Sequence, residues 1–189
     1  MNPLQQAIDA RVEAITDLRH DIHSWPEPGF EEVQTQQRIR AELTALGLTP
    51  HVCAKTGLYA DIGTGERTIG LRADIDCLRM TEANPTLPWR SKRDGCAHMC
   101  GHDGHTSVMV GVAQLIAAAA DRLNGRVRLI FQPAEEGPGG AAQMIAEGAL
   151  DGVDEIYGMH NWPQAPMGTL RTIAGPCMAQ VASFRAIIH

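Results

Sequence analysis

The sequence predicts an α/β fold with a mixed central sheet that is flanked by helices. Helix-type and strand-type patterns alternate along the chain, as they do in α/β domains. Apolar residues recur at steps of three and four in the helical segments, whereas the strand candidates are short, apolar and bounded by glycine, proline or acidic residues. With 189 residues and 44% hydrophobic content, the chain is long enough to bury a core.

Three helices follow from the apolar spacing. The first is expected over residues 4–23, before Pro26. The second covers residues 33–46 and ends at Gly47, where a left-handed cap costs least. The third, at residues 106–123, is apolar on nearly every face. We therefore expect this third helix to be buried against the sheet.

Short apolar runs indicate the strands. Residues 57–62 and 68–73 are separated by a glycine-containing segment at 63–66, which is typical of a hairpin. We therefore expect these two runs to form a strand, a turn and a second strand. Further strand candidates span residues 127–131, 155–159 and 168–172.

Charge and cysteine content restrict the function classes. The net charge is -6, and acidic and basic residues are interspersed, which disfavours a nucleic-acid partner or a membrane-binding face. The start of the chain lacks a signal-peptide pattern, and no apolar run approaches the roughly 20 residues of a membrane helix. Five scattered cysteines fit reduced thiols. We expect a soluble, cytoplasmic protein.

The densest chemical signal lies at residues 96–105, where two cysteines and three histidines occur in ten residues. This is a metal-ligand composition. Cys100 and His102 are two positions apart, so in extended backbone both side chains would reach one ion, with Gly101 between them. The alternative is a small closed zinc knuckle made from this segment alone.

Adjacent carboxylates follow the strand candidate at 127–131. Strand ends are where sites collect in α/β proteins, and neighbouring carboxylates in a bent segment can point in different directions. Of Glu135 and Glu136, one could therefore bind a metal while the other faces the attacking water, as metal-assisted hydrolysis requires. The alternative is that both simply lie near a helix N-terminus, where negative charge is favoured.

Further candidates also follow apolar strands. His160 comes directly after the candidate strand at 155–159, and its value lies in its proximity to the thiol, imidazole and carboxylate groups expected nearby. Together these groups make an open site for one or two divalent ions. Asp74 and Asp76 could ligate, orient a ligand histidine or cap a turn.

Five motifs occur in a family's order: RHDIH (19–23) with PEPGFEE (26–32), LRADID (71–76), HMCGHDGHT (98–106), QPAEEG (132–137) and MHNWP (159–163). On these residues the sequence resembles the N-acyl amino acid amidohydrolases, metallopeptidase-like enzymes that include hippurate hydrolases and indole-acetyl amino acid hydrolases. The resemblance implies a zinc-peptidase-like catalytic domain and a small N-acyl amino acid, such as a hippurate-like compound, as substrate.

The resemblance also implies roles for individual residues. A two-metal centre would be bound by Cys100, His102, Glu136 and His160, while Glu135 would act as general base and acid. Asp76 would lie close behind the metals. Asp74 and His105 remain weaker candidates. Zinc suits the thiolate and imidazoles, and manganese, cobalt and nickel stay open.

Relatives of this kind continue for about as long again, so the resemblance implies a truncated enzyme. Residues 1–180 would be the N-terminal part of the catalytic domain, and 181–189 the start of a lid or dimerisation domain. A homodimer is then expected for the full-length form, and this chain alone would lack part of the site. The alternative function is a non-catalytic metal-binding fragment or assembly module.

Overall fold

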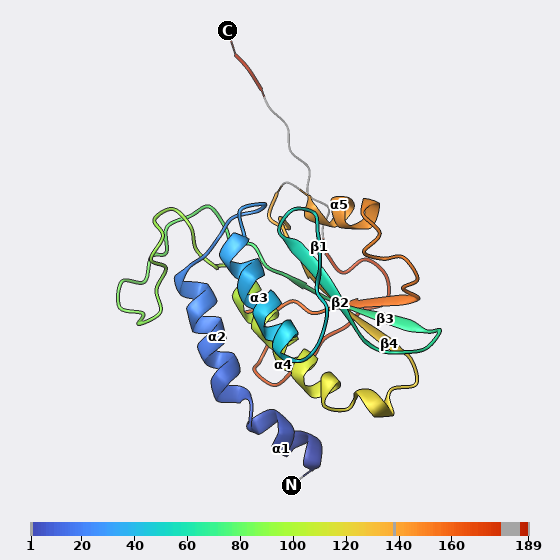
Figure 1. Cartoon of the computed structure of the whole chain (residues 1–189). Coiled ribbons are helices and arrows are strands. Elements are labelled where there is room, and N and C mark those ends of the chain that lie inside the picture. The colour runs from blue at the N-terminus through green and yellow to red at the C-terminus, as the bar shows by residue number, and fades with distance from the viewer. Residues whose placement is uncertain (1, 138, 179–185, 189) are drawn as a thin grey trace.

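The computed structural model describes residues 2–137, 139–178 and 186–188. A five-stranded sheet lies at its centre, with the strand order β1-β2-β4-β3-β5. Helices α2, α3 and α4 lie together on one side of the sheet and α5 on the other (Figure 1). The predicted α/β fold with a mixed sheet and flanking helices is therefore confirmed. The strands are β1 (His51–Cys53), β2 (Gly57–Gly63), β3 (Thr68–Asp74), β4 (Arg126–Gln132) and β5 (Glu155–Gly158).

The helices agree with the periodic pattern except at their ends. They are α1 (Pro3–Asp9), α2 (Val12–Ser24), α3 (Val33–Ala45), α4 (His102–Ala117) and α5 (Gly140–Ala146), with a 3-10 turn η1 (Ala120–Arg122). The prediction of one helix over 4–23 is wrong, because Arg11 has a φ of -111° and separates α1 from α2. Gly47 has a φ of 78°, which confirms the left-handed residue after α3.

The predicted hairpin between 57–62 and 68–73 is also wrong. Strand β4 lies between the two, antiparallel to β2 and parallel to β3, so that Arg126 pairs with both Gly63 and Thr68. The physical reason is the apolar run Leu129–Phe131, which is fully buried and suits a central strand covered on both faces. The segment between β2 and β3 therefore crosses the end of β4.

Two smaller predictions differ from the structure, two elements were not predicted, and one prediction is not tested. Residues 168–172 form no strand, while β1 and α5 were not predicted. The third helix begins at His102, four residues before its expected start. The expected start of a second domain falls on 181–189, of which 181–185 and 189 lie outside the described residues.

Alternation along β4 separates the two cores. Leu129 and Phe131 face the larger core, which contains Met109 and Val110 of α4. Ile130 points the other way and packs in a smaller cluster with Met144 of α5. Because both faces of β4 are covered, the strand is held firmly, and the positions that follow its end are well determined.

Three strands deliver residues to one edge of the sheet. Strands β4 and β5 both run parallel to β3, so their carboxyl ends lie at the same edge. Asp76 follows β3, Glu135 follows β4 and His160 follows β5. In open α/β sheets this edge is where sites form.

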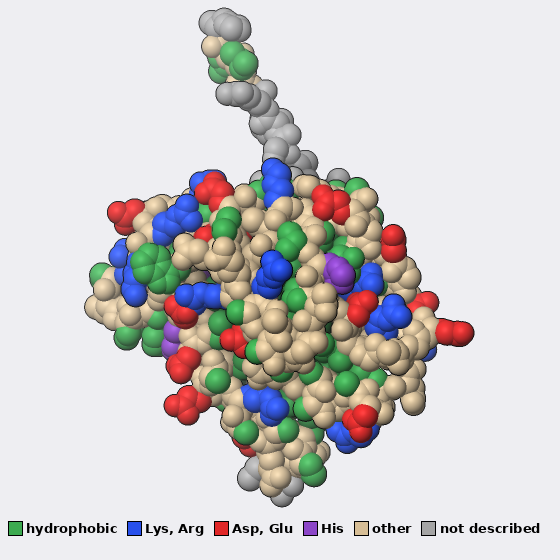
Figure 2. Space-filling model, viewed as in Figure 1, with side chains coloured by type: hydrophobic (Ala, Val, Ile, Leu, Met, Phe, Trp, Pro, Cys, Tyr) green, Lys and Arg blue, Asp and Glu red, His purple; other side chains and the backbone are tan. Residues whose placement is uncertain are grey.

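The surface carries mixed charge. Lys and Arg side chains are interspersed with Asp and Glu over the face shown in Figure 2. None of the helices in the described part of the chain combines the length and apolar character needed to span a lipid bilayer.

Candidate metal centre

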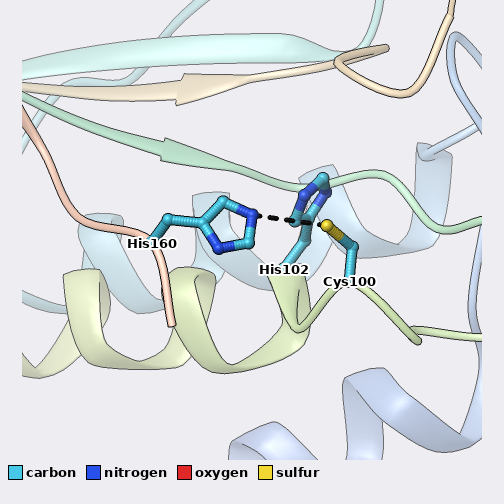
Figure 3. A group of neighbouring side chains, drawn as sticks. All are labelled: Cys100, His102 and His160. Carbon is cyan, nitrogen blue, oxygen red and sulfur yellow. Dashed lines mark hydrogen bonds between the residues drawn. The ribbon is translucent and has the colours of Figure 1, made fainter. Parts of the chain in front are cut away.

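Three side chains from two segments of the chain converge at this edge of the sheet. Cys100 precedes α4, His102 is the first residue of α4, and His160 follows β5 (Figure 3). Their Sγ and ring nitrogen atoms all lie within 4.8 Å of one another. Cys100 Sγ lies 3.3 Å from His160 Nε2. A thiol and two imidazoles at this spacing could hold one divalent ion.

The approach of Cys100 to His102 differs from the predicted extended geometry. Gly101 adopts φ 92° and ψ 18°, the left-handed conformation, and caps the N-terminus of α4. The two side chains therefore meet around a tight turn. A Cβ at this position would lie 2.5 Å from Oδ1 of Asn161, so the backbone conformation favours glycine and any Cβ would displace the Asn161 side chain.

His102 is oriented by Asp76. Its Nδ1 lies 2.9 Å from the backbone oxygen of Asp76 and 3.2 Å from Oδ1 of the same residue. Nδ1 therefore carries the proton and donates, which leaves Nε2 as an acceptor. Nε2 lies 3.8 Å from Glu135 Oε2 and 3.8 Å from Glu136 Oε1. The Nδ1–H tautomer leaves Nε2 free to bind a metal ion.

The two glutamates lie in a bend after β4. Ala134 has a φ of 53°, which turns the chain immediately before the pair. The Glu136 backbone N–H donates to Asp76 Oδ2 at 2.9 Å. The Glu135 side chain is 41% exposed and that of Glu136 only 21%. Helix α5 begins later, at Gly140, with no acidic residue in its first turn, so the helix-terminus interpretation does not explain the pair.

Two buried atoms of this cluster have no hydrogen-bond partner among the described residues. They are His102 Nε2 and Glu136 Oε1, which face each other at 3.8 Å. Unpartnered buried polar atoms are costly and call for an explanation. A cation between them would satisfy both, and the thiol, imidazole and carboxylate donors suit zinc or a similar divalent ion. The residues present therefore fit a metal ion.

The electrostatics of the cluster favour a cation. Burial, the hydrogen bond with Glu136 and the charges of the surrounding carboxylates raise the pKa of the Cys100 thiol to about 12. Burial and the charge of Glu136 raise the pKa of Glu135 above its ordinary value. Burial is the largest cause of both shifts, and the surrounding negative charge adds to it; a bound divalent cation would lower both pKa values.

Asp74 and His105, the weaker candidates, lie against the same cluster. Asp74 Oδ1 is 2.6 Å from His105 Nδ1, and Asp74 Oδ2 is 3.6 Å from His102 Nε2. Burial raises the pKa of Asp74, but the hydrogen bond to His105 and the charges of His102 and Arg72 outweigh it and lower that pKa to about 2. Asp74 is therefore an anion at neutral pH.

The closed zinc knuckle is not formed. In the described part of the chain, Cys96 and His98 belong to none of the residue groups that could hold a metal ion. Both side chains are buried. The ligand groups instead draw on distant segments, as an open site does.

Two functional neighbours were missed in the sequence. Asn161 lies against the ring of His105, and the only local signal was its position directly after His160. His23 forms a buried pair with Asp103, from Nδ1 to Oδ2 at 2.8 Å. These two residues are 80 positions apart, so no local pattern connects them.

A family model and individual relatives match this chain. Peptidase family M20/M25/M40 matches residues 70–181. An N-acetylcysteine deacetylase of Bacillus subtilis is 42% identical over 178 residues, which cover 92% of this chain and 47% of the relative. An IAA-amino acid hydrolase, ILR1-like 4 of Arabidopsis thaliana, is 41% identical over 175 residues, covering 90% of this chain and 39% of the relative.

Solved structures agree with these relatives. The YXEP protein of Bacillus subtilis, described as a dinuclear metal-binding peptidase of the M20 family, superposes with a TM-score of 0.79 at 41% identity. That match covers 84% of this chain and 45% of the other. The chain thus spans less than half the length of the relatives that it matches.

Proposed function

The chain belongs to peptidase family M20/M25/M40, and from this membership we propose that it is the metal-binding, catalytic part of an amidohydrolase that cleaves N-acyl amino acids. The observation that carries the proposal is the convergence of Cys100, His102 and His160 beside two carboxylates at the carboxyl edge of the sheet. The family resemblance in the sequence analysis is confirmed by the family match.

The names of the relatives support an N-acyl amino acid as substrate. One relative removes the acetyl group of N-acetylcysteine and another hydrolyses an IAA–amino acid conjugate. Both reactions separate an acyl group from an amino acid, and we extend this class to hippurate-like compounds. A cavity of about 870 Å³ beside Glu135, His160 and Trp162 has the volume of a small-molecule site.

Cys100, His102, Glu136 and His160 would hold one or two divalent ions. Zinc is favoured by the thiolate and the imidazoles, while the carboxylate and the family resemblance leave manganese, cobalt or nickel open. When bound, such an ion lowers the pKa of a water molecule and polarises a carbonyl group.

Glu135 is our proposed general base and acid. It is the more exposed of the two glutamates, it lies 3.8 Å from His102 Nε2, and its pKa is raised by burial and by Glu136. A raised pKa suits a carboxylate that takes a proton from water and passes it to the leaving nitrogen. Asp76 acts as a positioning residue, because it holds both His102 and the Glu136 backbone.

For the full-length protein we keep two further elements of the proposal. One is a homodimer, formed through the lid or dimerisation domain that the resemblance places after residue 180. The other is a cytoplasmic location, which fits the five scattered cysteines as reduced thiols.

Metal analysis combined with a substrate panel tests the proposal. The purified chain is analysed for metals by mass spectrometry, and the release of free amino acid from N-acetyl, N-benzoyl and indole-acetyl amino acids is measured. Bound metal is the expected result, and turnover on this panel would show that this part of the enzyme is sufficient for catalysis. Bound metal without turnover would favour the non-catalytic metal-binding alternative for this chain, and absence of metal would contradict the ligand assignment.

A further inference from the structure

We propose that Asp74, His105 and Asn161 form a positioning chain that holds His160 in the orientation needed to bind the metal. The inference rests on the proposed function and deepens it, since it gives a positioning role to three residues that bind no metal themselves. It follows from the unequal surroundings of the two histidines of the candidate centre.

His102 and His160 differ in how firmly they are held. His102 is fully buried at the start of α4. His160 is exposed and lies on the segment after β5. An exposed ligand on a connecting segment needs partners beyond the metal to fix its ring and tautomer.

The chain begins at a buried carboxylate. Asp74 is 1% exposed and accepts from Arg72 Nη1 at 2.6 Å and from His105 Nδ1 at 2.6 Å. With Nδ1 donating to an anion, the neutral His105 ring has Nε2 free as an acceptor. The backbone N–H of Asn161 donates to that Nε2 at 3.0 Å. Asp74 thereby selects the tautomer that can receive the backbone next to His160.

The backbone of Asn161 also orients His160, through its carbonyl group. The carbonyl oxygen of Asn161 accepts from His160 Nδ1 at 2.7 Å, which leaves Nε2 directed at Cys100 Sγ, as Figure 3 shows. The His160 ring also packs edge-on against His105, with ring centroids 4.7 Å apart and an interplanar angle of 72°. His105 therefore restrains both the backbone beside His160 and the ring itself.

The Asn161 side chain closes the arrangement. Its Oδ1 lies 2.5 Å from His105 Nε2. An amide oxygen cannot pair with an acceptor nitrogen, so with His105 as the Nδ1–H tautomer the amide must turn its NH2 group toward Nε2. The side chain also occupies the space over Gly101, where a Cβ would come within 2.6 Å of Nδ2. The segment carrying His160 is thus fitted between α4 and the turn that carries Cys100. Movement of Asn161 would displace His160.

Asp74 and His105 could instead be metal ligands, since they form a group with His102 within 4.8 Å. Their hydrogen bonding argues for the positioning role. Asp74 Oδ1 and His105 Nδ1 are paired with each other, and His105 Nε2 is occupied by Asn161. His102 Nε2, in contrast, has no partner among the described residues.

A double-mutant cycle on zinc affinity tests the chain of contacts. Zinc dissociation constants of the full 189-residue chain are measured by competition with a chromogenic chelator. His105→Phe keeps a ring against His160 but removes both hydrogen bonds, and Asp74→Asn is a milder second variant. We expect each to weaken zinc binding by roughly 10- to 100-fold. In a His160→Ala background neither should cause a further loss.

The matched control is Asp61→Asn, which disrupts a carboxylate pair with Arg128 between strands β2 and β4 and touches none of the residues of the candidate centre. It should lower stability but leave the zinc affinity unchanged. A direct readout needs no substitution: long-range ¹H–¹⁵N spectra of the wild-type chain should show His105 as the Nδ1–H tautomer.

The outcomes separate the two proposals. Three results would overturn this inference while zinc binding by the wild-type chain stands. They are equal losses of zinc affinity with and without His160, no loss of zinc affinity in either variant, and an Nε2–H tautomer of His105. Failure of the wild-type chain to bind zinc would overturn the proposed function, and this inference with it.

Discussion

Asp76 holds His102 through two atoms: its backbone oxygen lies 2.9 Å from His102 Nδ1 and its Oδ1 lies 3.2 Å from the same nitrogen. Its other carboxylate oxygen accepts the backbone N–H of Glu136 at 2.9 Å. Asp76, which follows β3, thus orients two proposed ligands: His102 at the start of α4 and Glu136 in the bend after β4. Outer partners of this kind determine how well a metal site is formed.

Replacement of Asp76 should therefore weaken the metal site without removing a ligand. In Asp76→Ala, His102 keeps the backbone acceptor but Glu136 loses its anchor, so we expect zinc affinity to fall by about 10- to 100-fold. Asp61→Ala is the matched control, because Asp61 pairs with Arg128 within the sheet. Chelator competition measures both, and an equal loss in the two variants would contradict the assigned role.

Gly101→Ala should disturb the centre more than a glycine change of similar backbone conformation elsewhere. Gly101 and Gly95 both have positive φ, 92° and 73°, so alanine is strained at each by about 1–2 kcal/mol. Only at Gly101 does the new Cβ meet Asn161, whereas no described atom lies within 4 Å of a Cβ at Gly95. Urea denaturation and zinc titration should show the larger loss in Gly101→Ala. Equal losses of stability and zinc affinity in Gly101→Ala and Gly95→Ala would contradict a steric conflict with Asn161.

The buried pair of His23 and Asp103 predicts a pH-dependent contribution to stability. The hydrogen bond to Asp103 raises the pKa of His23 above 6.5 despite burial. A raised folded-state pKa stabilises the fold below pH 6.5, and this contribution is lost as the pH rises through the folded value. The pKa of Asp103 is lowered: burial opposes the shift, and the hydrogen bond to His23 outweighs it, so the contribution of Asp103 persists down to pH 3.8.

The test compares wild type with His23→Gln by chemical denaturation over a pH series in the presence of chelator. The difference in unfolding free energy should be largest between pH 3.8 and 6.5 and should shrink at higher pH. A difference that grows above pH 6.5 would show that the sign is wrong.

The fold was predictable from sequence where structure is local. The apolar period located α3, and Gly47 marked its end, because both depend on neighbours a few residues apart. The order of the strands was not predictable in this way. The insertion of β4 between β2 and β3 depends on pairing across more than 50 residues, whereas the hairpin interpretation used only the glycines between the two runs.

The candidate site was predictable to a similar extent. The sequence identified Cys100, His102 and His160 because they are metal-ligand residue types that lie after a strand or in a glycine-containing turn. The structure brings these three side chains together. The extended geometry assigned to Cys100 and His102 was wrong, since Gly101 adopts positive φ and starts α4. The contacts of Asp74 with His105 and of His105 with Asn161 join segments 31 and 56 residues apart, which no local pattern reveals.

The variant Glu135→Gln tests whether Glu135 is the general base of a metal-dependent amide hydrolysis. Initial rates of amino acid release from an N-acetyl and an N-benzoyl amino acid are measured for wild type and variant, with the metal content of each determined on the same samples. If Glu135 moves the proton, the variant should keep its metal and lose at least about 100-fold in rate, the lower range for a positioned acid–base group. A variant that hydrolyses both substrates at the wild-type rate with its metal intact would contradict the assignment of Glu135 as the general base.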